Sequence, residues 1–359
     1  MIIQPTREQT RRILRKRTYS GQGFGPLSFE CLGMGMGIGL SQGASRGGSL
    51  APLSSLFTGA NLLQGCQSHL GLSYASVMLA TGSGAPAAGI SGTLTAGLIP
   101  KPVKVAITGN GTQTTATYSL YLDGGTTVVQ SGTCAASVAI AGLPGLSVTF
   151  PVGAYTTLHS YQAVTSAWGD PAGTDANGYT FASTKQPIIT PGFNGYPGLL
   201  LDGVDDVGIN TTLTCPAVTS MRIIYRLVTF AAATPISGPN TNSASPFFYH
   251  SGVASVQAFA TAGGSVALAG TTAVPVRARA LFSNQATDTC RFGANVGTAV
   301  NAGSGRTGTG RQLGFSAAGG FVQFANMEIF GIWISSADQS STDTAFDAAA
   351  LAYYPTLAE

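Results

Sequence analysis

Residues 199–210 read LLLDGVDDVGIN, and this stretch decides how the second half of the chain folds. The three leucines form a short apolar run that can be buried on both faces, as in the core of a β-sandwich. Asp202 and Gly203 then form the Asp-Gly pair that favours a tight turn, and VGIN begins another stretch suited to a strand. The pattern predicts two strands joined by a turn that carries Asp202, Asp205 and Asp206.

Three carboxylates within five positions stand out in a chain of which only 9% is charged. Aspartate side chains accept hydrogen bonds from turn amides, so a structural role in the turn is the favoured interpretation. A calcium site is an alternative because calcium prefers oxygen ligands, although the spacing is not that of a helix–loop–helix calcium loop. A catalytic pair is disfavoured, because a glycoside hydrolase needs two carboxylates facing one sugar and Glu328 is the only Glu between Glu30 and Glu359.

The composition predicts an all-β protein of two or three units. Gly accounts for 49 of 359 residues and hydrophobic residues for 44%, which suits strands joined by tight turns. The five cysteines lie more than 30 positions apart and form no C-x-x-C pair, so they are expected to be free, buried thiols in a reducing cytosol. No run of 18 apolar residues occurs, so no membrane span is expected. No cofactor motif is present.

The basic residues are concentrated at the N-terminus. Residues 1–122 hold nine Lys or Arg and two acids, whereas residues 123–359 hold eight Lys or Arg and twelve acids. A frayed tail and an arm that docks on an acidic protein surface both explain this, and nucleic-acid binding is the disfavoured alternative. The predicted docking residues are Arg7, Arg11, Arg12, Arg15, Lys16 and Arg17.

Residues 20–98 are rich in Gly, Ser, Ala and Leu and carry few charges. GMGMGIGLSQG, which begins at Gly33, alternates Gly with apolar residues but lacks the G-x-G-x-x-G spacing of a dinucleotide site. Such a pattern favours extended chain that lies closely on another backbone. We therefore expect residues 20–98 to be irregular or extended and to order on contact with other subunits.

Residues 101–165 contain short β-branched and aromatic runs separated by Gly, Asn-Gly and Asp-Gly turns, which predicts a small antiparallel sandwich. YSLYLDGGTTVVQSG and then IAGLPGLSVTFPVGAYTTLHSYQAVT resemble a β module that recurs in proteins of tailed-bacteriophage particles. The resemblance covers about 60 residues. The chain departs from the module's pattern by inserting Tyr121 before Asp-Gly-Gly and by lacking a Trp after it.

Residues 166–359 resemble a concanavalin A-like, or laminin-G-like, jelly-roll sandwich. The late stretches GGFVQFANMEIFGIWISS and STDTAFDAAALAYYP are similar to that family's last strand and closing helix. The matching early motifs are Trp168 with Asp170, Gln186 with Pro187, Asn194 with Gly195 and Pro197, and the run from Leu201 to Asp206.

Aromatic rings could stack on sugar rings in such a domain, and Tyr179, Phe193 and Tyr196 are the candidates for that role. Trp168 and Trp333 are expected in the core. His69, His159 and His250 have no motif companion, so a structural role is favoured for each.

The resemblance to tailed-phage particle proteins implies a non-enzymatic structural component of a tailed-phage virion, assembled in the host cytoplasm. The expected architecture is a basic, Gly-rich docking region (1–98), a small β-sandwich (99–165) and a concanavalin A-like sandwich (166–359). Its expected partners are other virion proteins and further copies of itself, with a homotrimer expected by analogy with other display proteins. A host glycan-binding adhesin or tail fibre is the alternative, and a polysaccharide depolymerase is disfavoured.

Overall fold

The computed structural model divides into Met1–Ser49 and Leu50–Glu359. The residues that it describes are 53–57, 62–169, 178–216, 218–228, 232–237, 247–251, 255–261, 264–269, 276–283, 289–292, 295–296, 308–316, 323–337 and 339–355. The predicted basic docking residues, and the expectations for residues 1–52, lie outside these ranges. Within them the chain is nearly all β, as predicted, and contains no helix long and apolar enough to cross a membrane.

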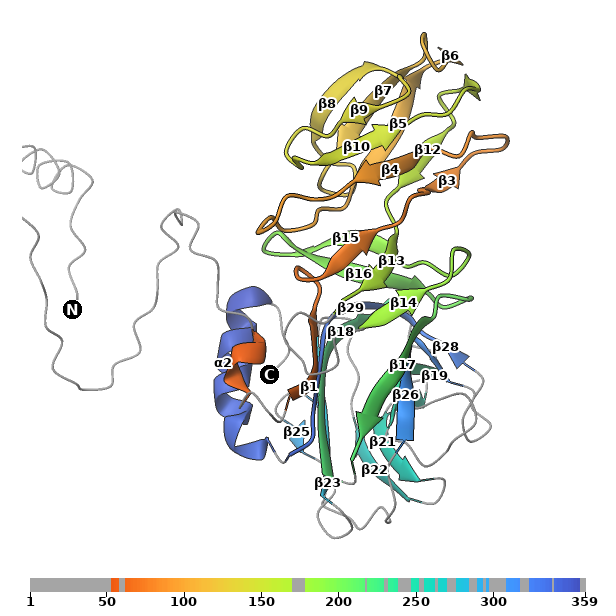
Figure 1. Ribbon diagram of the computed structural model, residues 1–359. Helices are drawn as coiled ribbons and strands as arrows, with labels where there is room; N and C mark the ends of the chain where they lie inside the picture. Colours follow the sequence, from red (N-terminus) through yellow and green to blue (C-terminus); the bar gives the residue numbers. More distant parts are fainter. Residues whose placement is uncertain are drawn as a thin grey trace, which may run out of the picture. The chain divides into compact units, whose positions relative to one another are not determined.

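The C-terminal part is a sandwich of two large antiparallel sheets (Figure 1). One sheet has eight strands: β15 (Ile188–Phe193), β16 (Tyr196–Asp202), β29 (Asn326–Ser335), β18 (Val218–Leu227), β23 (Val276–Ser283), β24 (Thr289–Phe292) and β25 (Asn295–Val296) in that order, with β1 (Leu62–Gln67) paired to the second half of β29.

The other sheet has nine strands: β2 (Leu72–Tyr74), β13 (Thr165–Trp168), β14 (Tyr179–Phe181), β17 (Gly208–Cys215), β26 (Gly308–Leu313), β19 (Ala232–Ser237), β20 (Phe247–Ser251), β21 (Ser255–Thr261) and β22 (Gly264–Ala269). A further short pair is formed by β27 (Phe315–Ser316) and β28 (Gln323–Phe324).

A bulge in β29 lets one strand serve two cores. Before the bulge, Met327 and Ile329 lie in the core between the sheets. After the extra residue Phe330, Ile332 and Ile334 lie in that core. Phe330 itself faces the opposite side, where the helix α2 (Asp343–Tyr353) and the 3₁₀ turn η1 (Leu53–Leu56) pack. Successive side chains of a strand alternate between faces, so one inserted residue switches which positions point inward.

The second core under α2 consists of Leu53, Phe57, Leu62, Ile224, Phe330, Trp333, Phe346, Ala350, Tyr353 and Tyr354. Arg222 holds this layer together. Its guanidinium carbon lies 4.9 Å from the ring centre of Phe57 and 4.7 Å from that of Phe346. Its Nη2 donates to the carbonyl of Gln339 at 2.7 Å and to Thr342 Oγ1 at 2.9 Å. Gln339 lies just before the short turn η4 (Ser340–Thr342), which leads into α2, and Thr342 is the last residue of that turn.

The smaller β module is an antiparallel sandwich, as predicted. Its five-stranded sheet runs β3 (Leu79–Thr81), β12 (Ser160–Gln162), β5 (Lys104–Gly109), β7 (Thr117–Tyr121) and β8 (Val128–Thr133). Its three-stranded sheet runs β4 (Gly89–Gly92), β10 (Leu146–Thr149) and β9 (Val138–Ala139), and β6 (Gly111–Thr112) pairs with β11 (Ala154–Tyr155). Alternate residues of β5, β7 and β10, such as Val105, Leu120 and Val148, fill its core.

The β7–β8 hairpin follows the chemistry of its Asp-Gly-Gly sequence. Asp123 Oδ1 accepts the amides of Gly125 and Thr126, and Oδ2 accepts that of Thr127 at 2.8 Å. Gly124 has a φ of 80°, a left-handed conformation that glycine adopts without steric cost.

Residues 62–98 include extended strands, as expected, but the expectation that they order only on contact with other subunits is wrong. These residues pair within their own chain. β1 belongs to the eight-stranded sheet and β2 to the nine-stranded sheet of the C-terminal sandwich, and β3 and β4 belong to the two main sheets of the module. Cys66, Met78 and Ile90 are buried in the core. The predicted boundary at residue 98 therefore does not separate a docking region from folded domains, because the backbone groups of residues 62–98 find partners in sheets that are completed by distant segments.

Module and C-terminal sandwich share a continuous stretch of core. Between β12 and β13, the carbonyl of Ala163 accepts a hydrogen bond from the amide of Ile189, and Val164 forms an isolated antiparallel β-bridge with Ile188. These contacts bring β3, which pairs with β12, close to the turn after β16.

Candidate functional site

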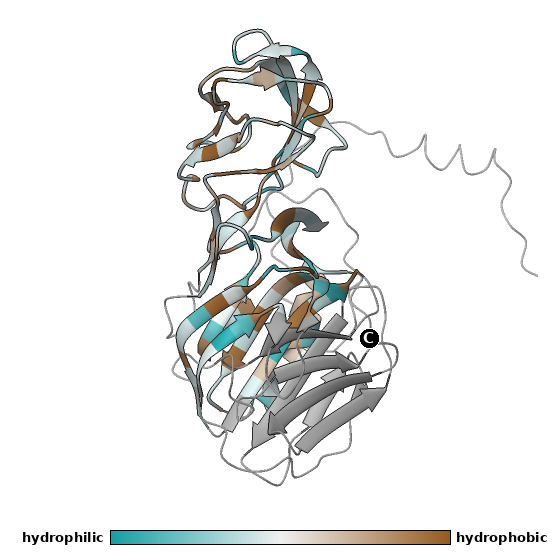
Figure 2. Cartoon of the chain, turned by 90° about the vertical axis from the view of Figure 1, so that its right-hand side faces the viewer, coloured by the Kyte–Doolittle hydropathy of each residue, from teal (hydrophilic) through white to brown (hydrophobic). Residues whose placement is uncertain are grey.

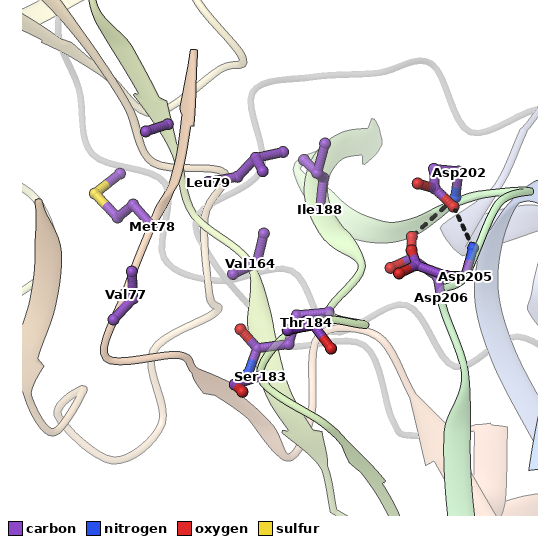
Figure 3. A pocket seen from close by; sticks show the side chains of 12 residues that line it. Val77, Met78, Leu79, Val164, Ser183, Thr184, Ile188, Asp202, Asp205 and Asp206 are labelled. Atoms are coloured by element: carbon purple, nitrogen blue, oxygen red, sulfur yellow. Dashed lines mark hydrogen bonds between the residues drawn. The ribbon is translucent and has the colours of Figure 1, made fainter. Parts of the chain in front are cut away.

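Asp202, Asp205 and Asp206 lie at the turn between β16 and β17, where carboxylates and backbone amides form hydrogen bonds. Asp202 Oδ1 accepts a hydrogen bond from the amide of Val204 at 2.7 Å. It also accepts one from the amide of Asp205 at 3.3 Å, and Asp206 Oδ2 accepts one from the amide of Asp202 at 2.9 Å (Figure 3). Gly203 lies between them with a φ of 77°. The structural interpretation is therefore confirmed for Asp202 and Asp206, whose carboxylates accept hydrogen bonds from backbone amides of their own turn.

The same turn concentrates negative charge. Carboxylate oxygens of Asp202, Asp205 and Asp206 all lie within 4.8 Å of one another. Asp202 is exposed and Asp205 is half-buried, whereas only 7% of Asp206 is exposed. Burial raises the pKa of Asp206 to about 6; the hydrogen bond from the Asp202 amide opposes this shift, and the neighbouring carboxylates of Asp202 and Asp205 add to it. Asp206 therefore changes its charge in mildly acidic solution.

These three side chains line one wall of a cleft of about 280 Å³. The facing wall is β3 and the residues before it, where Val77 is 53% exposed and Leu79 is 48% exposed. Ser183 and Thr184, from the loop between β14 and β15, line the cleft between these walls (Figure 3). The cleft thus combines apolar side chains, hydroxyl groups and carboxylates.

A cation such as calcium is the metal class that this donor set suits, because calcium takes oxygen ligands. The cluster offers three carboxylates, however, against the roughly six to eight oxygens that calcium coordinates. Asp202 Oδ1 and Asp206 Oδ2 also already accept backbone amides. The side chains of Asp202 and Asp206 thus serve the turn, and the cluster supplies only part of the ligand set of a calcium site.

The three predicted sugar-stacking residues do not form one surface. Tyr179 is fully buried in the core between the sheets and its hydroxyl donates to Gln64 Oε1 at 2.9 Å, so its assignment to glycan stacking is wrong. Phe193 and Tyr196 pack against the other core, the one under α2. Phe193 makes an edge contact with Phe330, and Tyr196 lies 4.7 Å from the ring of His69. Both remain partly exposed.

Glu328 is engaged in structure. It is 2% exposed on β29, where it forms an ion pair with Arg226 and accepts a hydrogen bond from Thr190. The arginine also lies over the ring of Phe193, with its guanidinium carbon 5.4 Å from the ring centre. Both carboxylate oxygens of Glu328 thus have partners on the sheet face opposite the main core.

The remaining residues singled out in the sequence are structural where they are described. Trp168 and Trp333 are both fully buried, as expected. Burial lowers the pKa of His69 to about 4, which keeps its ring neutral between Tyr196 and Tyr353. His159 accepts the Thr156 amide through Nδ1 and contacts the Ser83 carbonyl through Nε2. Cys66 and Cys134 are buried and form no disulfide bond, as expected. The side chain of His250 lies outside the described residues.

Sequence reasoning found the carboxylate wall of the cleft and missed the rest of it. Val77, Leu79, Ser183 and Thr184 belong to no motif. Val77 and Leu79 lie opposite Asp206 through the pairing of β3 with β12 and of Val164 with Ile188, and Ser183 and Thr184 follow β14, which pairs with β17. The one local signal was the apolar run Val77–Leu79 in an otherwise polar and small-residue stretch, ASVMLATGSG.

No family model and no curated protein matches the chain. Among solved structures it is similar to one of botulinum neurotoxin type C, whose cell entry depends on interaction with two ganglioside molecules, with 9% identity and a TM-score of 0.39. It is also similar to the binding domain of botulinum neurotoxin DC in complex with rat synaptotagmin II and to that of serotype D, each with 10% identity and a TM-score of 0.38. The matches cover 51% of this chain and 48–49% of those chains, so the chain spans about half their length. Scores this low do not assign the chain to a family.

Proposed function

We propose that this chain is a non-enzymatic binding protein displayed on the virion of a tailed bacteriophage, and that the cleft between β3 and the aspartate turn binds a host surface glycan. The observation that carries the glycan proposal is the mixed lining of the cleft, with exposed aliphatic side chains facing carboxylates. The virion assignment rests on the resemblance of the module sequence to tailed-phage particle proteins.

A sugar ring has an apolar face formed by C–H groups and an edge of hydroxyl groups. Val77 and Leu79 offer apolar surface for such a face, while Asp202 and Asp205 offer charged acceptors, which form the stronger hydrogen bonds with hydroxyl groups. The volume of about 280 Å³ is near the lower end of small-molecule pockets and suits one or two sugar units.

The charge of the cleft narrows the ligand class. Three carboxylates on one wall repel sialic acids, uronic acids and phosphorylated sugars, and they favour neutral or amino sugars. Binding of an amino sugar should strengthen as Asp206 ionises, because the attraction between the ammonium group and the wall then increases.

The arrangement does not favour hydrolysis. The two carboxylates of a glycoside hydrolase flank the glycosidic bond, one acting on each side. Asp202, Asp205 and Asp206 share one turn and one wall, so they approach a sugar from the same side. Glu328 is held by Arg226 and Thr190 and does not line this cleft.

Glycan-array binding by the full chain, with neutral, amino and acidic sugars, tests the proposal. Val77→Ser should weaken binding to a retained glycan about fivefold, because a half-exposed aliphatic contact is worth roughly 1 kcal/mol. Val152→Ser is the matched control: Val152 is 87% exposed but does not line the cleft, so this change should leave binding unaltered.

Binding that depends equally on both valines, or binding confined to acidic sugars, would contradict the cleft assignment. If no sugar binds while the chain still assembles into particles, its role is capsid or tail decoration alone. Cryo-electron microscopy of particles that carry a labelled chain tests the virion assignment separately.

A further inference from the structure

The β module ends on one side in an unprotected strand. β8 is the last strand of the five-stranded sheet and pairs with β7 alone. Five of its six residues are exposed, with Val128 at 50% and Val129 at 44%. In the part of the chain that the structure describes, no backbone hydrogen bond other than those to β7 involves β8.

Proteins usually prevent such edges from pairing with other strands. The common devices are a lysine or other charge on the strand, a proline, a bulge, or a covering segment. β8 reads VVQSGT and contains neither charge nor proline. A bulge lies only at its start, opposite Leu120 and Tyr121, and the remaining residues Gln130–Thr133 keep a regular register with β7. The Gln130 side chain forms hydrogen bonds with the backbone of Ala139 and Ala141, and these bonds leave the backbone edge of β8 unpaired.

The surrounding surface is equally uncharged. From Ala75 to Gly169 the only acidic or basic residues, histidine aside, are Lys101, Lys104 and Asp123. In Figure 2 the ribbon of the module is accordingly mostly pale or brown, with little teal. A domain with so few charges gains little protection against self-association from electrostatic repulsion.

We propose that β8 pairs antiparallel with β8 of a second copy of this chain, about a two-fold axis, so that one sheet continues across both modules. A bare strand edge presents alternating amide donors and carbonyl acceptors, and another strand is the partner that satisfies them in register. A copy of β8 is favoured over a charged partner because pairing it with itself brings no like charges together and places β-branched residues across from one another.

A two-fold contact implies an even number of chains in the assembly. If the expected trimer also forms through other surfaces, β8 pairing would join two trimers into a hexamer. A protein that remains trimeric at all concentrations, with β8 amides open to solvent, would therefore overturn this inference.

Two measurements on the full chain test the pairing. Analytical ultracentrifugation should show a reversible, concentration-dependent association with an even stoichiometry. Hydrogen–deuterium exchange should show that amides of residues 128–133 become protected as the concentration rises. Association without protection at β8 would place the interface elsewhere and refute the proposal.

Charged substitutions at Ser131 test whether β8 itself forms the interface, because Ser131 is exposed and adjoins the centre of β8. Ser131→Lys and Ser131→Glu should each weaken self-association about tenfold by placing like charges near the two-fold axis. An equimolar mixture of the two variants should regain association, because opposite charges then meet. Thr211→Lys adds a charge to an exposed position of β17, away from this edge, and should leave association unchanged. Failure of the mixture to recover would exclude a two-fold pairing of β8.

Discussion

Asp206 is a single side chain that should make the stability of the protein depend on pH. Burial first, and then its two neighbouring carboxylates, raise its pKa from 3.8 to about 6. A carboxyl group with a raised folded-state pKa stabilises the fold when it is protonated. The stabilisation from protonated Asp206 is complete below about pH 4 and is lost as pH rises through 6. The loss lowers the free energy of unfolding by about 3 kcal/mol.

Asp206→Asn should therefore leave stability at pH 4 nearly unchanged and increase it by up to about 3 kcal/mol at pH 7. The amide oxygen of Asn can still accept the Asp202 amide. Urea unfolding followed by the fluorescence of the buried Trp168 and Trp333 measures this. Asp205→Asn is the control, because it keeps the buried carboxyl and should retain most of the pH dependence. Equal stability gains for both variants at pH 7 would show that burial of Asp206 is not the cause.

At the scale of the element, the aspartate turn should fold without a metal ion. Its carboxylates accept backbone amides at Asp202, Val204 and Asp205, so calcium would have to compete with those hydrogen bonds. We expect millimolar calcium to leave the melting temperature unchanged at pH 7. If calcium bound a site and were present at 100 times its dissociation constant, it would instead raise the free energy of unfolding by about 2.7 kcal/mol. A rise of a few degrees that a chelator reverses would overturn the turn interpretation.

The strand β1 is the element whose loss should be most damaging among those near the N-terminus. Leu62 and Cys66 are buried, and Gln67 supplies the carbonyl that accepts Trp168 Nε1–H at 3.2 Å. Removing residues 1–67 exposes the second half of β29 and should give aggregated protein with the fluorescence of exposed tryptophan. Removing residues 1–52 keeps η1 and β1 and should give a folded, soluble chain. If both truncations fold equally well, β1 is dispensable to the sandwich.

At the scale of the whole molecule, the charge distribution predicts how the chain attaches to a particle. Six of the nine basic residues that precede residue 123 lie between Arg7 and Arg17. Deleting residues 1–30 should abolish incorporation into particles and leave the C-terminal sandwich folded, as judged by an unchanged unfolding transition. Charge reversal of the same six residues should have the same effect if they meet an acidic surface. Normal incorporation of the deletion variant would show that the arm is a solvated tail.

The sequence by itself determined the local features of this protein. Strand and turn chemistry predicted the all-β class, the Asp-Gly-Gly hairpin at Asp123 and the turn at Asp202, because these depend on neighbouring residues and on the conformations that Gly and Asp allow. The burial of Trp168 and Trp333 followed from the size and apolarity of their side chains.

Only the tertiary structure decided which distant segments complete each sheet. Residues 62–98 contain no long strand pattern, and β1 becomes a sandwich strand because β29 offers it an edge 260 positions or more away in the sequence. The same pairing of distant segments placed Val77 and Leu79 opposite the aspartates and buried Tyr179, which looked accessible from its sequence context. Hydrogen bonding between strands depends on backbone groups that every residue shares, so the sequence of one strand does not specify its partner; burial of the combined apolar surface does.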